Sequence, residues 1–284
     1  MIIREPCLPP GWYPRDKGKI VEFLEPFAKR GGDAVSAFAA IAPHAGWYYS
    51  GLTATASVSF LDTEVETVAI IGGHLGANMP VLIAAEDAVK TPFGNMEIDK
   101  ELREKFQKQV SFGSDRYADN TVEVLLPMVH YFFPNASLLW LRFPADISSF
   151  EAGILLEEAA SSLGRKLAVI ASTDLTHYGA NYGFSPKGRG KPALEWVKQV
   201  NDAAFIAAVL EKNPSLVLKR AEEDSSACSA GAVLGALGFA ASLVQEPAGN
   251  LKARLLDYRT SADVGDSENV PDSFVGYAAI TFRK

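Results

Sequence analysis

Apolar runs typical of buried strands alternate along the chain with segments that have the hydrophobic spacing of helices. Strands are predicted at residues 35–41, 67–71, 79–85, 88–92, 136–143, 166–171, 251–259 and 274–282. Helices are predicted at residues 20–27, 52–61, 99–109, 122–133, 150–163, 194–210 and 228–244, and another helix starts at Pro214. This alternation predicts one α/β domain over residues 1–284, with three α/β/α layers around a mostly parallel central sheet.

Two of the predicted helices have an unusual composition. Pro127 lies inside one of them and predicts a kink, because its ring removes an amide donor and frees the carbonyl of Glu123. Residues 227–244 are uncharged and only just long enough to span a membrane. Because Ala, Gly and Ser dominate this segment, we interpret it as a buried core helix and expect no membrane partner.

Three of the four histidines follow strand-like apolar runs, each in a loop that contains glycine. They are His44, His74 and His177. If the strands are parallel, the three loops open at one edge of the sheet, which is where open α/β folds bind ligands. A single such histidine is commonly structural, but three in equivalent positions favour a shared site. His130 lies within a helical segment, and we expect it to be structural.

Cys228 is the next candidate for chemistry. Asp224-Ser225-Ser226 predicts a helix N-cap, which places Cys228 in the first turn, where the helix dipole and free amides stabilise a thiolate. The alternative is a small buried apolar residue. Together with His44 and His74, the thiolate would be a ligand set for Fe, Cu or Zn. The spacing matches neither a zinc finger nor an HExxH helix, so the prediction rests on loop topology.

Asp174 and His177 lie three residues apart in one loop and suit a second role. A carboxylate can orient an imidazole that then moves protons, so we assign this pair to acid–base catalysis. Asp174 could instead cap the following turn. The aromatic residues Trp47, Tyr49 and Tyr178 could bind substrate at the mouth of a pocket, or could pack in the core.

Composition limits the partners and the compartment. The chain has 284 residues, of which 48% are hydrophobic and 21% charged, as in a globular protein with a large core. Its net charge of −7 argues against nucleic acid and anionic membranes, which both require a basic surface. Two cysteines make no disulfide framework, and the first residues lack the features of a signal peptide, so we expect a cytoplasmic protein.

Several motifs resemble those of the Memo family, whose members occur alone or as the middle part of the AmmeMemoRadiSam gene group. Cys228 at the start of a predicted helix is one of the matching features. The other matching segments, in order along the chain, are Arg4-Glu5-Pro6, Gly11-Trp12-Tyr13-Pro14, Ala42-Pro43-His44-Ala45-Gly46-Trp47-Tyr48-Tyr49-Ser50-Gly51, Gly73-His74, Ser172-Thr173-Asp174-Leu175-Thr176-His177-Tyr178-Gly179 and Ser273-Phe274-Val275-Gly276-Tyr277-Ala278-Ala279.

This resemblance implies a fold similar to the catalytic subunit of class III extradiol dioxygenases, which use non-haem iron. It implies metal ligands at His44, His74 and Cys228, with the loop of Asp174 and His177 beside them. Copper-dependent redox activity and phosphopeptide binding have both been attributed to the family. The gene group also implies a functional link to AMMECR1-like and radical SAM proteins.

The chain departs from the family pattern at three places. Asn120-Thr121-Val122-Glu123 stands where a His-Ser-x-Glu run is usual, and Gly72-Gly73 stands where Ser or Pro often precedes the second histidine. Cys228 is followed by Ser229-Ala230-Gly231 instead of Gly with a nearby Pro. We expect these changes to alter the shape of the pocket more than the metal site.

Three functions remain open on this basis. The first is a metal-dependent oxidoreductase that acts on a small molecule, with His177 as acid–base residue. The second is a binding protein that uses the same pocket for a peptide or a small anion. The third is a metal-free hydrolase with Cys228 as nucleophile and His177 as base.

Overall fold

A large mixed sheet lies at the centre of the protein. The structure, a computed structural model, describes residues 1–28, 36–244, 250–264 and 270–284. Within these residues nine strands form the sheet in the order β10-β12-β2-β9-β3-β8-β4-β7, and β11 also pairs with β12. These strands are β10 (His177–Gly179), β12 (Ser273–Arg283), β2 (Ala39–Ala42), β9 (Leu167–Ser172), β3 (Thr67–Gly72), β8 (Ser137–Arg142), β4 (Val81–Ile83), β7 (Phe112–Ser114) and β11 (Lys252–Thr260).

The four middle strands of the sheet run parallel to one another, and the strands next to them on either side run antiparallel to them. Strands β2, β9, β3 and β8 are parallel neighbours. β12 runs antiparallel to β2, and β4 runs antiparallel to β8. The predicted parallel arrangement therefore holds for the four central strands. These include all three of the runs that precede a candidate histidine.

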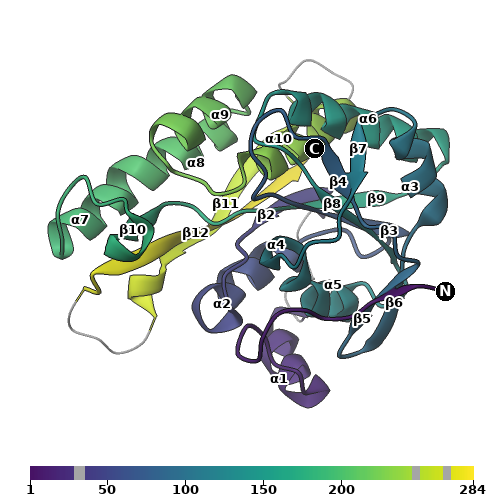
Figure 1. Cartoon of the computed structure of the whole chain (residues 1–284), viewed down its shortest axis with the longest axis horizontal. Coiled ribbons are helices and arrows are strands. Elements are labelled where there is room, and N and C mark those ends of the chain that lie inside the picture. Colours follow the sequence, from purple (N-terminus) through teal and green to yellow (C-terminus); the bar gives the residue numbers. More distant parts are fainter. Residues whose placement is uncertain (29–35, 245–249, 265–269) are drawn as a thin grey trace.

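Helices cover both faces of the sheet and complete the three predicted layers, which confirms the α/β/α fold class (Figure 1). One face carries α3 (Lys100–Gln107), α6 (Ser148–Ser162), α8 (Asp202–Leu210), α9 (Pro214–Glu223) and α10 (Ala230–Val244). The other face carries α1 (Lys17–Ala28), α2 (Trp47–Val58), α4 (Asn120–Glu123) and α5 (Leu126–Phe132). Beside them, β1 (Ile3–Arg4), β5 (Ala88–Thr91) and β6 (Gly94–Glu97) form a small second sheet.

The central strands read as continuous apolar runs because both of their faces are buried. In β3, Val68 and Ile70 pack into the core beneath α1, α2 and α5. Ala69 and Ile71 pack into the core beneath α6 and α10. Successive side chains of a strand point to opposite faces, so a strand between two helical layers needs an apolar residue at every position.

Several predicted elements differ in their bounds, for identifiable reasons. The first strand begins at Ala39, and residue 35 of the predicted run lies outside the described residues. Helix α2 begins at Trp47, five residues earlier than predicted. Pro127 ends one helix and starts another, so the predicted kink is a break between α4 and α5. The predicted helix 194–210 is divided into α7 (Lys191–Trp196), a π-helical turn η2 (Val197–Asn201) and α8.

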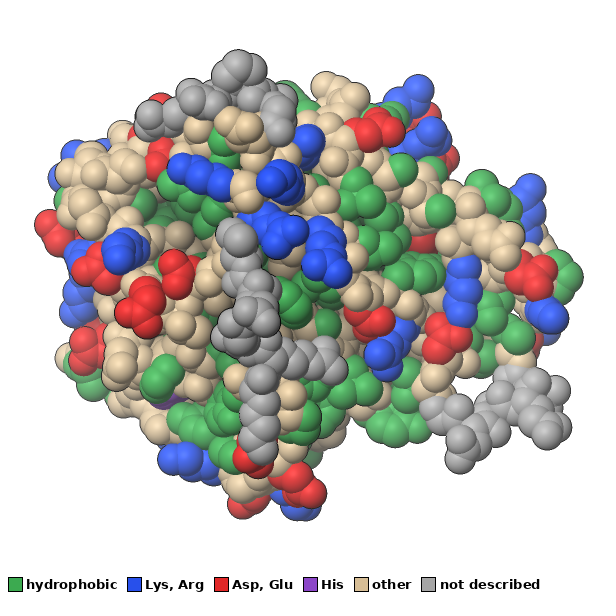
Figure 2. Space-filling view, turned by 180° about the vertical axis from the view of Figure 1, so that it is seen from behind, with side chains coloured by type: hydrophobic (Ala, Val, Ile, Leu, Met, Phe, Trp, Pro, Cys, Tyr) green, Lys and Arg blue, Asp and Glu red, His purple; other side chains and the backbone are tan. Residues whose placement is uncertain are grey.

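The outside of the protein is chemically mixed, and its most apolar helix is internal. On the face shown in Figure 2, side chains of both charge signs lie among exposed apolar ones. Helix α10, the uncharged segment of the sequence, is buried along most of its length. Across the described ranges, no helix combines the length and the apolar character that crossing a bilayer would require.

Glycines let α10 approach α6 at backbone distance. A Cβ atom on Gly238 would lie 1.9 Å from the carbonyl oxygen of Phe150, and one on Gly153 would lie 2.0 Å from the carbonyl oxygen of Gly235. Such distances are far inside contact range, so neither position has room for a methyl group. The close packing of α10 on α6 therefore explains why small side chains occur between residues 227 and 244.

We expect Gly238→Ala to lower the free energy of unfolding by about 2 kcal/mol, because the new methyl group must push α10 away from α6. Helix propensity alone predicts the opposite sign, a gain of about 1 kcal/mol. Urea denaturation would measure the change. Gly76→Ala is the control, since the space around that position is open, and it should leave stability unchanged. A stabilised Gly238→Ala protein would contradict the close packing.

Candidate metal centre

Loops at the carboxyl edge of the sheet bring the predicted ligands together. His44 lies two residues after β2, His74 lies two residues after β3, and Cys228 lies just before α10. Their three ligand atoms all lie within 4.8 Å of one another. The Sγ atom of Cys228 is 3.2 Å from Nε2 of His44, and the two imidazole centroids are 5.0 Å apart. The structure therefore brings His44, His74 and Cys228 together as one cluster.

The donor atoms fit a transition metal. Ligands that approach a tetrahedral zinc ion to about 2.0–2.3 Å lie roughly 3–4 Å from each other. The separations among His44, His74 and Cys228 need only small side-chain adjustments to reach that range. Two imidazoles and one thiolate are ligands that Zn, Cu and Fe all accept. The residues present therefore fit the metal that the sequence predicted.

Hydrogen bonds to Nδ1 orient both imidazoles. Nδ1 of His44 lies 3.0 Å from Oγ of Ser172, and Nδ1 of His74 lies 3.0 Å from Oδ2 of Asp119. Because an ionised carboxylate only accepts hydrogen bonds, Nδ1 of His74 must carry the proton. Nε2 is then the nitrogen left to bind a metal in place of its own proton, which is the usual arrangement of a metal-binding histidine.

Asp119 is itself held ionised. Burial raises the pKa of its carboxyl group, but hydrogen bonds from His74 and Thr121 and the charge of Arg142 lower it further, to well below the usual range. Nη2 of Arg142 is 3.3 Å from Asp119, and its Nε donates to the carbonyl of Gly73 at 2.9 Å. Sequence reasoning missed Asp119 and Arg142. Only the helix-capping position of Asp119, before α4, could have drawn attention to it.

His74 lies in a strained backbone conformation, directly after a closely packed glycine pair. Its φ of +58° is in the left-handed region, which costs a non-glycine residue of order 1–3 kcal/mol. A Cβ atom on Gly73 would lie 2.3 Å from Cβ of Ser229, and one on Gly72 would lie 2.1 Å from Oγ1 of Thr121. The Gly72-Gly73 pair therefore lets the chain leading to His74 touch both α4 and the Cys228 loop.

Cys228 differs from its prediction in position. Helix α10 begins at Ala230, so Cys228 precedes the helix and does not lie in its first turn. Its backbone N–H donates to the carbonyl of Asp174 at 3.2 Å. Burial raises the pKa of the Cys228 thiol, but His44 and His74 lower it further, to well below its usual value. The imidazoles, and not the helix terminus, provide the main stabilisation of the thiolate.

Asp174 and His177 do not form the predicted pair. Oδ1 of Asp174 accepts from the backbone N–H of His44 at 2.7 Å, and Oδ2 lies 3.9 Å from Nε2 of His44. His177 instead directs Nδ1 to the carbonyl of Leu175 at 3.1 Å, which leaves Nε2 available. The prediction that Asp174 orients His177 is therefore wrong. Asp174 organises the metal-binding loop, and a backbone carbonyl orients His177.

A pocket of about 850 Å³ adjoins this group. His44, His74, Asp174 and His177 all line it. Its walls and mouth come from residues distant in sequence, which include Trp12, Tyr48, Tyr49, Asn120, Asn181, Tyr182, Ser261, Ser273 and Tyr277. The site is thus an open polar and aromatic cavity with the two candidate histidine ligands on its wall.

Two of the three predicted substrate-binding aromatics lie elsewhere. Trp47 is buried, and its indole N–H donates to the carbonyl of Val124 at 2.9 Å. Tyr178 is buried against Phe274. Alternate residues of a strand face opposite sides, so with His177 in the pocket Tyr178 must point into the interior. Of the three aromatic residues predicted to bind substrate, only Tyr49 lines the pocket.

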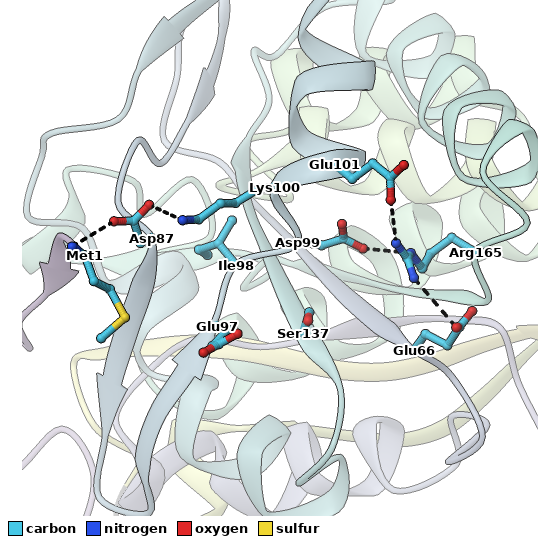
Figure 3. A pocket seen from close by; sticks show the side chains of 10 residues that line it. All are labelled: Met1, Glu66, Asp87, Glu97, Ile98, Asp99, Lys100, Glu101, Ser137 and Arg165. Atoms are coloured by element: carbon cyan, nitrogen blue, oxygen red, sulfur yellow. Dashed lines mark hydrogen bonds and ion pairs between the residues drawn. The ribbon is translucent and has the colours of Figure 1, made fainter.

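A second hollow, of about 380 Å³, lies at the opposite edge of the sheet, near the amino ends of β3, β8 and β9 (Figure 3). At one end of it Arg165 meets three carboxylates, those of Glu66, Asp99 and Glu101, and at the other end Asp87 meets Lys100 and the amino terminus. None of the described residues that line this hollow is His or Cys. Its cations, Arg165, Lys100 and the amino terminus, are all engaged in ion pairs with its carboxylates, and none of the residues predicted from sequence to carry the chemistry lies here.

The metal-free protein should contain one thiolate at neutral pH, and it should belong to Cys228. Burial and a hydrogen bond to Glu123 raise the pKa of Cys7 to about 11, so that thiol stays protonated. The ultraviolet absorbance of the thiolate should therefore persist below pH 7. Cys228→Ser should remove it and Cys7→Ser should not. A thiolate that forms only in strongly alkaline solution and disappears with Cys7→Ser would contradict the imidazole–thiolate pairing.

Comparisons with known proteins identify the family. The Memo-like protein family model matches residues 4–281. A MEMO1 family protein of Pyrococcus abyssi is 32% identical and one of Thermococcus onnurineus is 31% identical, and each alignment covers the whole of both chains. Among solved structures, an uncharacterised protein of Escherichia coli K12 has a TM-score of 0.46 at 13% identity, over 85% of this chain and 98% of that one. By the family model and by these relatives, the chain belongs to the Memo-like family.

Proposed function

We propose that this protein binds one transition metal ion through His44, His74 and Cys228 and catalyses an oxidation or reduction of a small molecule in the adjoining pocket. The observation that carries the proposal is the convergence of two imidazoles and a thiol beside a cavity of about 850 Å³. Structural metal sites are usually closed by four protein ligands, whereas catalytic sites keep a position open. Three ligands next to a pocket fit the catalytic pattern.

The donor set narrows the metal to Fe, Cu or Zn. When bound, Fe or Cu would supply a redox couple, and any of the three would supply a Lewis acid. The ligand set does not separate Zn from Cu and Fe, and we favour a redox metal on the resemblance of the motifs to those of an iron-dependent fold. The similarity to class III extradiol dioxygenases that the motifs imply is part of this proposal.

The chain's own residues would bind the substrate and move protons. His177 lines the pocket and keeps Nε2 available, so it is the proposed proton carrier. Tyr49 and Tyr182 are both about half exposed at the pocket and offer aromatic contact to a ligand. Asp119 would make His74 a more basic ligand by accepting its Nδ1 proton.

The lining of the pocket favours an uncharged small molecule over an anion. Proteins usually bind phosphate and carboxylate groups with Arg or Lys. Among the described residues that line the pocket there is neither Lys nor Arg. A peptide ligand remains compatible with the open mouth, provided that the part entering the pocket carries no negative charge.

A metal-free hydrolase is the second candidate, on one specific observation. The 3.2 Å separation between Sγ of Cys228 and Nε2 of His44 is a nucleophile–base distance. In that function His44 would be the base, in place of the His177 expected from sequence. Metal binding and this reaction compete for the same thiolate, so the two functions exclude each other in one molecule.

Two further proposals rest on the family and the cysteines. We propose a cytoplasmic location, because a thiolate ligand must stay reduced and both Cys7 and Cys228 are free thiols. We also propose a functional link to AMMECR1-like and radical SAM proteins, on the gene grouping that occurs in the Memo family. No nucleic acid is proposed as a partner, given the net charge of −7.

Titration with Zn²⁺ against a competing chelator should give about one equivalent bound to the wild-type protein. His44→Ala, His74→Ala and Cys228→Ser should each lower the affinity by more than the roughly 10–100-fold typical of losing an outer contact. His177→Ala should keep the wild-type affinity. Binding should weaken as the pH falls, since protons compete for the thiolate and the imidazoles.

These variants also discriminate between the roles. Equal loss of affinity in His177→Ala and Cys228→Ser would make His177 a ligand and contradict its role as proton carrier. Wild-type protein that binds no metal, but whose Cys228 is trapped by a thiol-directed substrate analogue, would favour the hydrolase. Circular dichroism on every variant separates lost ligands from lost folding.

A further inference from the structure

Two buried polar residues lie behind the pocket in a position that neither metal binding nor proton transfer explains. Asn201 is 4% exposed and Asp202 is fully buried. Neither lines the pocket. Buried polar groups are costly unless their hydrogen bonds are made, so the partners of this pair indicate why the fold contains it.

Asp202 holds the loop that carries His177. One of its carboxylate oxygens accepts from the backbone N–H of Thr176 at 3.1 Å and also from the Thr176 hydroxyl. Its other oxygen accepts from the hydroxyl of Tyr258 at 2.7 Å. A Cβ atom on Gly276 would lie 2.0 Å from Asp202, so glycine there makes room for the carboxylate. Thr176 is the residue before His177, and it is fixed through both backbone and side chain.

Asn201 joins that loop to the loop that carries Cys228. Its amide nitrogen donates to Oγ1 of Thr176 at 2.9 Å and to the carbonyl of Asp224 at 2.9 Å. One side-chain amide therefore bridges two segments that are distant in sequence. Asp224 begins the short stretch that leads to Cys228, so its position influences where the thiolate lies.

The far end of the same stretch is fixed to the same loop. The backbone N–H of Cys228 donates to the carbonyl of Asp174 at 3.2 Å, and that of Ser229 donates to Oγ1 of Thr173 at 3.2 Å. Residues 224–229 are thus attached at both ends to residues 173–176. Asn201 supplies the attachment at the amino end.

A π-helical turn brings the two residues to this place. Asn201 ends η2 and Asp202 begins α8. In a regular α-helix adjacent side chains diverge by about 100°, which makes it hard for both to reach the same loop. A π turn inserts an extra residue and widens the helix, and such turns are frequent at functional sites.

We propose that Asn201 and Asp202 are positioning residues that fix the Cys228 thiolate and the His177 imidazole relative to each other. The inference rests on the proposed metal function and deepens it by naming the internal support of the site. Asp202 fixes the His177 side through Thr176. Asn201 is bonded to the same Thr176 and also to the carbonyl of Asp224, so it holds the start of the segment that leads to Cys228 at a fixed distance from the His177 loop.

Co²⁺ binding tests the proposal, because the thiolate–cobalt charge-transfer absorption reports the geometry of Cys228 and not overall stability. Burial raises the pKa of Asp202 to about 6, so the titrations are done at pH 8, where the carboxylate is ionised. Asn201→Ala should weaken Co²⁺ binding by about tenfold and change the charge-transfer band. Val200→Ala is the matched control, since Val200 is an exposed neighbour in the same turn, and it should leave both unchanged.

A milder variant guards against unfolding. Thr176→Val removes the hydroxyl that links Asn201 to the loop but keeps the backbone hydrogen bond to Asp202. It should shift the affinity by about threefold in the same direction. Wild-type affinity and an unchanged band in either folded variant would overturn the proposal.

Failure of the metal function gives a different result. If the wild-type protein binds no Co²⁺, the positioning role is tested instead by titrating the Cys228 thiol of the metal-free protein with pH and following the ultraviolet absorbance of the thiolate. In that case Asn201→Ala should raise the pKa of Cys228, because the thiolate moves away from His44, while Val200→Ala should not. An unshifted titration in folded Asn201→Ala would overturn the positioning role independently of any metal.

Discussion

The parallel pairing of β2, β9 and β3 is the constraint on which the rest of the site depends. The register pairs Ala42 with Ser172 at the ends of β2 and β9. His44 and Asp174 each lie two residues beyond that pair, and the backbone of His44 donates to Asp174 across the gap. Ser172, still within β9, contacts the His44 ring. The hydrogen bonds of the sheet therefore determine where the first ligand and its neighbours lie.

The buried charges of Cys228 and Asp119 beside the metal ligands both have partners of opposite sign. The Cys228 thiolate meets the imidazoles of His44 and His74, and the Asp119 carboxylate meets Arg142 as well as His74. An unpaired buried charge would cost several kcal/mol. The metal-free site is thus arranged as alternating charges, and a cation that replaces the two imidazole protons keeps the thiolate compensated. The imidazoles and the thiolate, which compensate each other when no metal is bound, are also suitable ligands for a cation.

The sequence predicts the features that depend on a local pattern of residues. It does not predict those that depend on contacts between distant parts of the chain. An apolar run followed by a histidine is readable within ten residues, so His44, His74 and the α/β fold could be predicted. Asp119 and Asn201 reach the site through residues far away in the chain, His74 and Thr176, and the only local signal is the capping position of Asp119 before α4. The helix N-cap predicted at Asp224-Ser225-Ser226 was wrong, since Ser225 adopts a left-handed φ of +49° and α10 begins only at Ala230.

The two histidines owe their places to different physical causes. His44 is 1% exposed and is held by the sheet register, by Ser172 and by the backbone bond to Asp174. The His74 side chain is 35% exposed, its backbone is left-handed, and its position depends on Asp119 and on the absence of a side chain at Gly73. A register tolerates few changes, whereas a loop held by side-chain contacts can be rebuilt. The position of His44 therefore follows mainly from the sheet, with one added contact from the Asn120 amide to its carbonyl, whereas the position of His74 follows from the residues around its loop.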